Sequence, residues 1–402
     1  MNQNINNLFQ IASKSSRKII GLMSGTSLDG LDVALCEISD SGEKTKVNLL
    51  NFETIDYSED FKFEIRKVFA KKQIDFQHFA LLNEYIGNIH GKMILECLKK
   101  WNISAIEVDL IASHGQTVMH APKILHQQEK FPNATLQIGD GDHIAVKTGI
   151  ITISDFRQKH LAGGGEGAPL AVYGDYFIFG QKGENRILLN MGGIANFTFL
   201  PENLNPEEVF VTDTGTGNTL IDAFTRHYFP ELSFDKNAEI SKKGTINQEL
   251  LLDLKENDFF KKPFPKTTGP ELFSKEYVFN AQNSSNTKNI NVNDLLATLT
   301  QFSAETITEA VKYAIKISNN PNDDFTIYMS GGGMHNPLMV ETLKTLLPYK
   351  FKKTDDLGIS GDAKEAVLFA ILANENVAGG KSDFGTRKGI PSVSMGKISF
   401  PN

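Results

Sequence analysis

The chain has 402 residues, enough for two or three domains, and its 40% hydrophobic and 22% charged content is that of an ordinary globular protein. A net charge of −7 and an isoelectric point near 5.8 argue against nucleic acid or an anionic membrane as the main partner. Two cysteines, Cys36 and Cys97, are too few for a disulfide framework. With no apolar stretch of membrane-spanning length and no signal-peptide pattern, we expect a cytoplasmic protein.

The first half of the chain predicts a mixed α/β arrangement. Its apolar residues alternate or cluster as buried strands do, then follow helical spacing, then return to strands. The predicted strands lie at residues 18–23, 31–38, 46–57, 108–112 and 150–155, and the helical stretch at 59–100. Polar clusters follow the last two strands, where ligands of open α/β sheets gather. We expect residues 1–17 to form a poorly ordered extension.

The second half begins the same order again. Residues 185–200 read as a strand, a Gly-Gly turn and a second strand, and residues 208–213 as a third strand. Asn218 is a candidate N-cap of the helix that follows. Residues 295–317 predict a long amphipathic helix and 325–329 another strand, while residues 230–290 give no clear pattern. Two halves that open with strand, glycine turn and strand predict an architectural repeat.

Four glycine-containing loops, at residues 24–30, 190–196, 213–218 and 330–336, follow predicted strands. Each alone is more often only a turn, but four at successive strand ends favour a triphosphate site, because glycine lets backbone N–H groups face phosphate and hydroxyls donate to its oxygens. The candidate ATP-binding residues are Ser24, Gly25, Thr26, Ser27, Asp29, Gly192, Gly193, Asn196, Gly215, Gly217, Asn218, Gly331, Gly332 and Gly333.

Asp29 adds a carboxylate to the first of these loops. A carboxylate repels phosphate unless a cation lies between them, and Mg²⁺ is held by carboxylate and phosphate oxygens. Asp29 is therefore the candidate metal ligand, and the predicted cofactors are ATP and Mg²⁺.

From residue 18 onward the motifs, taken in order, resemble those of the 1,6-anhydro-N-acetylmuramic acid kinases, which belong to the actin/hexokinase/Hsp70-like ATPases. The matching motifs lie at residues 21–30, 113–117, 155–157, 162–170, 190–196, 213–218, 330–336 and 364–370. The resemblance implies two related RNase H-like (actin-like ATPase) domains flanking an ATP cleft. They would span residues 18–184 with a returning segment 362–402, and residues 185–361. It also implies a homodimer.

The resemblance further implies the reaction. Water adds to the anomeric carbon of the anhydro sugar, the internal 1,6-ether opens, and the freed O6 takes the γ-phosphoryl group of ATP. The product would be N-acetylmuramic acid 6-phosphate, an intermediate of cell-wall recycling. Alternatives are a kinase of a related amino sugar and, from another class, a non-catalytic nucleotide-switch protein of the same superfamily.

Two carboxylates match catalytic positions of the family. Asp213 matches the base that removes a proton from the attacking water, although by itself it would read as a turn residue after a strand. Glu365 lies where the family uses a second acid near that water. It also resembles the last residue of a capping box begun by Asp362, at the start of a predicted helix 362–376. The two roles for Glu365 do not exclude each other.

The candidate sugar-binding residues are Asp155, Arg157, His114 and Gln116. Arg157 could hold the lactyl carboxylate of the sugar in a forked contact. The alternatives are a structural ion pair between Asp155 and Arg157 and a buried strand-end histidine.

Three positions depart from the family pattern. Glu166 stands where glutamine is usual, His160 where an acid is frequent, and Thr216 where proline is common. These positions flank the expected sugar and phosphate sites, so they bear on which sugar is the substrate.

Overall fold

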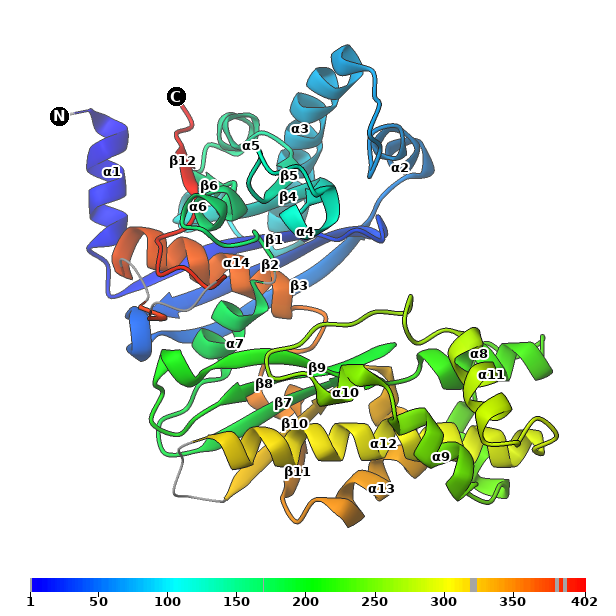
Figure 1. Ribbon diagram of the computed structural model, residues 1–402. Coiled ribbons are helices and arrows are strands. Elements are labelled where there is room, and N and C mark those ends of the chain that lie inside the picture. Colours follow the sequence, from blue (N-terminus) through cyan, green and yellow to red (C-terminus); the bar gives the residue numbers. More distant parts are fainter. Residues whose placement is uncertain (1, 169, 319–323, 380–382, 386–388) are drawn as a thin grey trace. The chain divides into compact units, whose positions relative to one another are not determined.

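The computed structural model describes residues 2–168, 170–318, 324–379, 383–385 and 389–402, so Pro169 of the 162–170 motif lies outside the described residues (Figure 1). The chain divides into two compact units. Unit 1 contains residues 1–179 and 358–402, and unit 2 contains residues 180–357. Among the described residues, no helix is long and apolar enough to cross a bilayer.

Unit 1 is built on a seven-stranded mixed sheet with the order β12-β6-β4-β1-β2-β3, in which β5 also pairs with β4. The first three strands pair antiparallel, while β4 runs parallel to β1 and β6 parallel to β4. The strands are β1 (Ser16–Ser24), β2 (Gly30–Ser39), β3 (Lys46–Asp56), β4 (Leu110–Ala121), β5 (Ala134–Ile138), β6 (Thr152–Ser154) and β12 (Lys397–Ser399).

Helices pack against this sheet through apolar side chains. The helices of unit 1 are α1 (Gln3–Ala12), α2 (Glu59–Arg66), α3 (Phe76–Trp101), α4 (Lys123–His126), α5 (Gly141–Thr148), α6 (Phe156–Ala162), α7 (Ala171–Phe179) and α14 (Lys364–Asn374). Ile20 and Leu22 of β1 share a buried cluster with Leu82 and Ile86 of α3. At Gly21 the backbone of β1 lies directly on α14, because a Cβ there would be 1.9 Å from the carbonyl oxygen of Ala366.

Unit 2 repeats the strand order of unit 1 in a five-stranded sheet, β11-β10-β7-β8-β9. β7, β8 and β9 pair antiparallel, while β10 runs parallel to β7 and β11 parallel to β10. The strands are β7 (Asn185–Met191), β8 (Ile194–Leu200), β9 (Phe210–Thr216), β10 (Phe325–Ser330) and β11 (Lys350–Lys353). In each unit the order is third, second, first and fourth strand, followed by a further parallel strand, which is β6 in unit 1 and β11 in unit 2. This shared order confirms the predicted repeat and a pair of related RNase H-like α/β folds.

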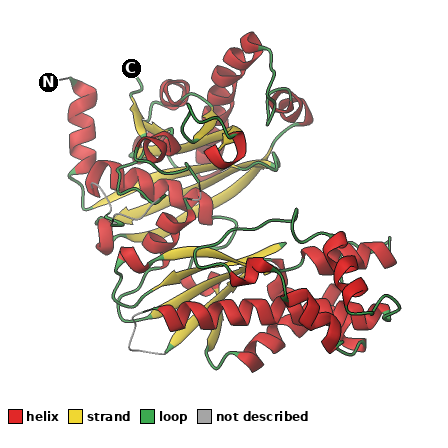
Figure 2. Cartoon of the chain, viewed as in Figure 1, coloured by secondary structure: helices red, strands yellow, loops and turns green. Residues whose placement is uncertain are grey.

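Figure 2 shows the helices of unit 2 gathered beside its strands. They are α8 (Thr219–Tyr228), α9 (Gln248–Lys255), α10 (Asp258–Lys261), α11 (Lys275–Ser284), α12 (Val292–Ile317) and α13 (Pro337–Leu346). Phe302 and Ile307 of α12 share the core with Phe197 of β8 and Leu220 of α8. Residues 230–290, whose sequence gives no clear pattern, thus contain the short helices α9, α10 and α11.

The structure corrects several predicted element boundaries. The stretch 59–100 is two helices, α2 and α3, and Asp75 caps α3 with its side chain. Residues 113–117 lie inside β4 rather than after it, and β9 continues past Asp213 to Thr216. Residues 3–12, within the segment expected to be a loose extension, form α1, and the Asn4 side chain donates to the backbone carbonyl of Asn402 at 2.6 Å.

Candidate active site

Three of the four predicted phosphate loops lie together in unit 2. The β7–β8 turn at residues 192–193 accepts backbone hydrogen bonds from Gly217 and Asn218, at 2.8 and 2.9 Å. A Cβ on Gly217 would lie 2.3 Å from the Gly192 carbonyl oxygen. A Cβ on Gly331, whose φ is +80°, would lie 2.8 Å from the backbone carbonyl of Met191 at the end of β7. Glycine is required at these positions because the loops touch through their backbones.

This packing also limits which amides could serve a phosphate. The N–H groups of Gly217, Asn218 and Thr219 already donate to the carbonyls of Gly192 and Gly193. Asn218 is the N-cap residue of α8, as predicted, but its side chain does not cap the helix and donates instead to the carbonyl of Met191 at 3.2 Å. The amides of residues 192–193 and 331–333 are therefore the better candidates.

Asp213 lies beside these loops in β9, where it pairs with Asn196 of β8. The register shifts between Ala195 and Asn196, so Thr214 is an extra residue that bends the strand. The N–H of Thr268 donates to Asp213 Oδ2 at 2.8 Å. Burial raises the pKa of the half-buried Asp213 carboxyl, and the Thr268 N–H partly opposes this. One oxygen is thus held, and a raised pKa suits a general base.

A cavity of about 400 Å³ opens beside the same loops, and motif reasoning missed most of its residues. Ile221 and Phe234 contribute apolar surface, and burial raises the pKa of the Asp222 carboxyl to about 6. Its lining residues are Asn218, Ile221, Asp222, Phe234, Asp235, Lys236, Asn237, Gly332, His335 and Asn336. A concave site that combines apolar surface with placed polar groups fits a small-molecule ligand. The helical spacing of apolar residues predicts Ile221 only as a core residue, so nothing in the sequence indicated that Ile221 lines a cavity.

In unit 1 the fourth loop joins β1 to β2 as the predicted hairpin. Ser24 at its start is buried, whereas Thr26, Ser27 and Asp29 are exposed. One exposed carboxylate beside hydroxyls is a donor set that fits Mg²⁺, which usually takes one or two carboxylates with phosphate oxygens and water. Among the described residues, no three His, Cys, Asp or Glu side chains form a cluster that could hold a metal by themselves.

The buried Ser24 belongs to a hydrogen-bond chain that the sequence did not indicate. The Gln116 amide nitrogen donates to the carbonyl of Gly25, so its oxygen accepts from the Ser24 hydroxyl. Tyr57 donates to Ser24 at 2.8 Å, and His90 Nε2 lies 2.8 Å from the Tyr57 oxygen. Since the Tyr57 proton is used, His90 Nε2–H is the donor at the far end. The Ser24 hydroxyl and the Gln116 amide oxygen are therefore hydrogen-bonded to each other, and the Ser24 proton is not available to a ligand.

Arg157, in α6, forms the centre of the predicted sugar side. Its Nε donates to His114 Nε2 at 2.9 Å, and its Nη1 donates to the carbonyl of Gly167 at 2.6 Å. Burial, together with the Arg157 charge, lowers the pKa of His114 well below its ordinary value, so the ring is neutral. His114 is buried and contacts Phe369, as a strand-end histidine would.

Glu365, in the first turn of α14, lies near enough to Arg157 for their charges to interact. Its side chain is exposed to solvent, yet the crowded surroundings raise its pKa by desolvation, and the positive charge of Arg157 partly opposes the rise. The predicted capping box is wrong: α14 begins at Lys364, its N-cap is Ala363, and no side chain caps it. Because the Glu365 carboxyl does not cap the helix, it is free of that role and exposed to solvent.

Asp155 and Arg157, both expected near the sugar, have different partners, so the alternative of an ion pair between them is wrong. Asp155 has a φ of +58° and forms an ion pair with Lys397 of β12. It lines a polar cavity of about 470 Å³ that includes Lys397 but neither Arg157 nor Glu365. The left-handed backbone at Asp155 turns the chain sharply between β6 and α6, so the two neighbouring side chains diverge.

The three departures from the family pattern have distinct surroundings. His160 is buried, its pKa is lowered by burial to about 4, and its Nδ1 accepts from the N–H of Gly167 at 3.0 Å. Glu166 is exposed, and its charge and that of Arg157 both act on His120 of β4, a neighbour that motif reasoning missed. Thr216 is buried in unit 2, and its hydroxyl has no hydrogen-bond partner among the described residues.

A family model described as anhydro-N-acetylmuramic acid kinase matches residues 17–396. A protein of that name from Pseudoalteromonas atlantica is 54% identical over 406 residues, covering 100% of both chains. One from Pseudoalteromonas translucida is 52% identical over 403 residues, again covering 100% of both. A relative from Caldanaerobacter subterraneus subsp. tengcongensis is 37% identical over 400 residues, covering 98% of this chain and 99% of its own. This chain belongs to the anhydro-N-acetylmuramic acid kinase family.

Proposed function

We propose that this protein is an ATP-dependent kinase that hydrolytically opens the 1,6-anhydro ring of anhydro-N-acetylmuramic acid and phosphorylates O6. Water adds to C1, the C1–O6 bond breaks, and O6 takes the γ-phosphoryl group from ATP. The products are N-acetylmuramic acid 6-phosphate and ADP, and the reaction would serve cell-wall recycling. Family membership and the names of full-length relatives support this substrate.

The observation that carries the proposal is the setting of Asp213. Its carboxyl has a raised pKa, one oxygen is held by Thr268, and it lies beside three glycine loops of the same unit. A base in this position would take a proton from water as the oxygen attacks C1. Positioned bases contribute about 10²–10⁴-fold to a rate.

We propose that ATP binds to unit 2 with its adenosine in the cavity beside Asn218 and Gly332, where Phe234 offers an aromatic surface and Asp222 an acceptor for ribose hydroxyls. The amides of residues 192–193 and 331–333 would face its phosphates. In unit 1, the exposed hydroxyls of Thr26 and Ser27 remain candidate phosphate donors, as the family resemblance implies. Asp29 would hold Mg²⁺ directly or through water. When bound, Mg²⁺ neutralises charge on the transferring phosphate.

The sugar would be held by Arg157 and Glu365 of unit 1. Arg157 has guanidinium donors besides those given to His114 and Gly167, and these could bind the lactyl carboxylate. Glu365 could orient the attacking water. The side chains of Ser24, Gln116 and His114 are buried and hydrogen-bonded to other residues. They would hold neighbouring site residues in position and would not contact the substrates themselves.

The test is ATP turnover with purified anhydro-N-acetylmuramic acid for the wild type and Asp213→Asn. The wild type should consume ATP only with the sugar, and Asp213→Asn should lose about 10²–10⁴-fold in kcat with little change in KM for ATP. A parallel assay uses the anhydro sugar without its lactyl group. If the enzyme turned over only the sugar without the lactyl group, that sugar and not anhydro-N-acetylmuramic acid would be its substrate. Full activity of Asp213→Asn would show that Asp213 is not the catalytic base.

We also propose that the protein acts in the cytoplasm as a homodimer. The two free, buried cysteines, Cys36 and Cys97, support a reducing compartment. The dimer is inferred from the family resemblance alone. Light scattering of the purified protein should give twice the 44.5 kDa mass of one chain.

A further inference from the structure

Lys266, only 8% exposed, is a buried lysine in unit 2 that the proposed reaction does not use. Its ammonium group donates to the carbonyls of Phe259 and Phe260, in α10, at 3.1 and 3.2 Å. It also lies 4.5 Å from the centre of the Phe259 ring and 5.3 Å from that of Phe264. Helix C-terminal carbonyls and aromatic faces both attract a cation. The side chain therefore anchors its own segment to α10.

The backbone of Lys266 connects this anchor to Asp213. The N–H of Asp213 donates to the carbonyl of Lys266 at 2.9 Å, and the N–H of Lys266 donates to the Thr212 hydroxyl at 3.1 Å. Two residues further on, Thr268 donates to the Asp213 carboxylate. Residues 266–268 thus lie along the edge of β9 and hold both the backbone and one oxygen of Asp213.

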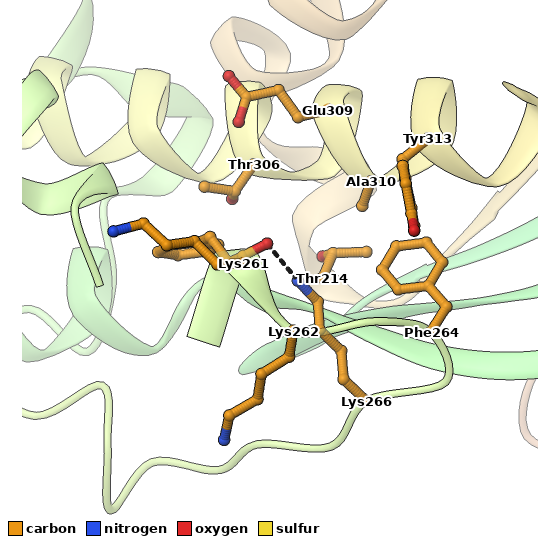
Figure 3. Close-up of a pocket in the computed structure, with 10 residues that line it drawn as sticks. Thr214, Lys261, Lys262, Phe264, Lys266, Thr306, Glu309, Ala310 and Tyr313 are labelled. Atoms are coloured by element: carbon orange, nitrogen blue, oxygen red, sulfur yellow. Dashed lines mark hydrogen bonds between the residues drawn. The ribbon is translucent and has the colours of Figure 1, made fainter. Parts of the chain in front are cut away.

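Lys266 lines a further cavity of unit 2, of about 260 Å³. Two other lysines, Lys261 and Lys262, line the same cavity without taking part in this arrangement. Figure 3 shows Lys266 reaching in beside Thr214, while the ammonium groups of Lys261 and Lys262 point away from it. The charged groups that act on Lys266 are Lys262 and, from α12, Glu309, which also pairs with Lys255. Burial and the Thr268 N–H are the influences on the Asp213 carboxyl.

We propose that Lys266 is a positioning residue for Asp213. Its side chain ties residues 264–268 to α10, and this segment fixes one oxygen of Asp213 and leaves the other for the reaction. The inference rests on the proposed role of Asp213 as the base. It predicts that loss of the ammonium group loosens the segment and releases the Thr268 hydrogen bond.

The test compares Lys266→Met with Lys262→Met, a matched control in which an exposed lysine of the same cavity is changed. In Lys266→Met, amide hydrogen exchange of residues 264–269 should rise about tenfold or more as the segment opens locally. With the anhydro sugar, kcat should fall about tenfold, as for a misplaced catalytic group. The Thr268 N–H lowers the pKa of the Asp213 carboxyl, so loss of this hydrogen bond should raise that pKa. The acid limb of the rate profile should therefore move to higher pH. Lys266→Arg, which keeps the charge, should restore the exchange pattern, and Lys262→Met should match the wild type.

Wild-type exchange and an unmoved pH profile in Lys266→Met would overturn the proposal. Faster exchange with an unmoved profile would also overturn it, because Lys266 would then support the fold alone. Failure of the proposed function is separate: it shows as an inactive wild type or an active Asp213→Asn, while exchange is read without any substrate. Should Lys266→Met not fold, Lys266→Gln, which keeps a donor for one carbonyl, is compared in the same way.

Discussion

At the scale of single residues, the hydrogen-bond chain from His90 to Gln116 determines what Ser24 can do. Each proton in the chain has one acceptor, so the Ser24 hydroxyl points to Gln116 and not to a ligand. A buried chain in which each hydrogen bond has one donor and one acceptor favours a single geometry. It would hold the start of the β1–β2 loop in place while Thr26, Ser27 and Asp29 face solvent.

Tyr57→Phe removes the central hydroxyl of this chain. His90 then loses its acceptor and Ser24 a donor, and both are buried, so we expect the protein to lose about 1–3 kcal/mol of stability. The urea unfolding midpoint measures this loss. Tyr85→Phe, at a half-exposed tyrosine of α3, is the control and should leave the midpoint unchanged. An unchanged midpoint in Tyr57→Phe would show that the chain contributes nothing to stability.

Single residues also show where sequence reasoning stops. Gly217 and Gly331 were recognisable as glycines at strand ends, and the structure accounts for both by close backbone contact. By contrast, His90 and Tyr57 lie 33 positions apart, and Ser24 and Gln116 lie 92 apart. No local pattern marks such partners, because only the assembled sheet brings them together.

At the scale of elements, the contact between β1 and α14 depends on Gly21. A side chain there would force the strand and the helix apart, since its Cβ would lie 1.9 Å from the Ala366 carbonyl oxygen. That helix also carries Glu365, so the same contact positions a candidate site residue.

Gly21→Ala should therefore lower stability by about 1–3 kcal/mol or more, as overpacking does. Gly25→Ala is the matched control, because the nearest atom to its Cβ would be 3.6 Å away. Chemical unfolding of the two variants makes the comparison. If Gly21→Ala unfolded no earlier than Gly25→Ala, the direct β1–α14 packing would be wrong.

The strands of both units could be predicted because their apolar residues alternate or cluster, and the strand–turn–strand openings were found in place. The residues at which β4 and β9 end could not be predicted from this pattern. β4 continues past His114 because it gains β5 as a new partner. β9 continues past Asp213 to Thr216 because a bulge lets the strand stay paired with β8. Strand ends depend on neighbours that a linear pattern does not contain.

At the scale of the whole molecule, the two units share one strand order but differ in their buried histidines. His90, His114 and His160 are buried in unit 1, and burial lowers the pKa of each. For His90 the pKa falls from 6.5 to about 4. Between these values the unfolded chain binds a proton that the folded chain does not, so stability is lost as pH falls.

We expect acid to weaken unit 1 through this difference. At about pH 5, His90 alone should cost about 2 kcal/mol relative to neutral pH. His90→Gln keeps a donor for Tyr57 but does not titrate, so its urea midpoint should fall less between about pH 7 and pH 5 than that of the wild type. Equal falls in the two proteins would show that His90 is not held neutral by the fold.

If one enzyme couples hydrolysis of the 1,6-ether to phosphorylation of O6, the reaction in ¹⁸O-labelled water should reveal both steps in one product. Mass spectrometry of the sugar phosphate formed from anhydro-N-acetylmuramic acid and ATP should show one label, carried by the C1 hydroxyl and absent from the phosphate group. A label in the phosphate, or an unlabelled product with the ring still closed, would show that the enzyme does not couple the two steps in this way.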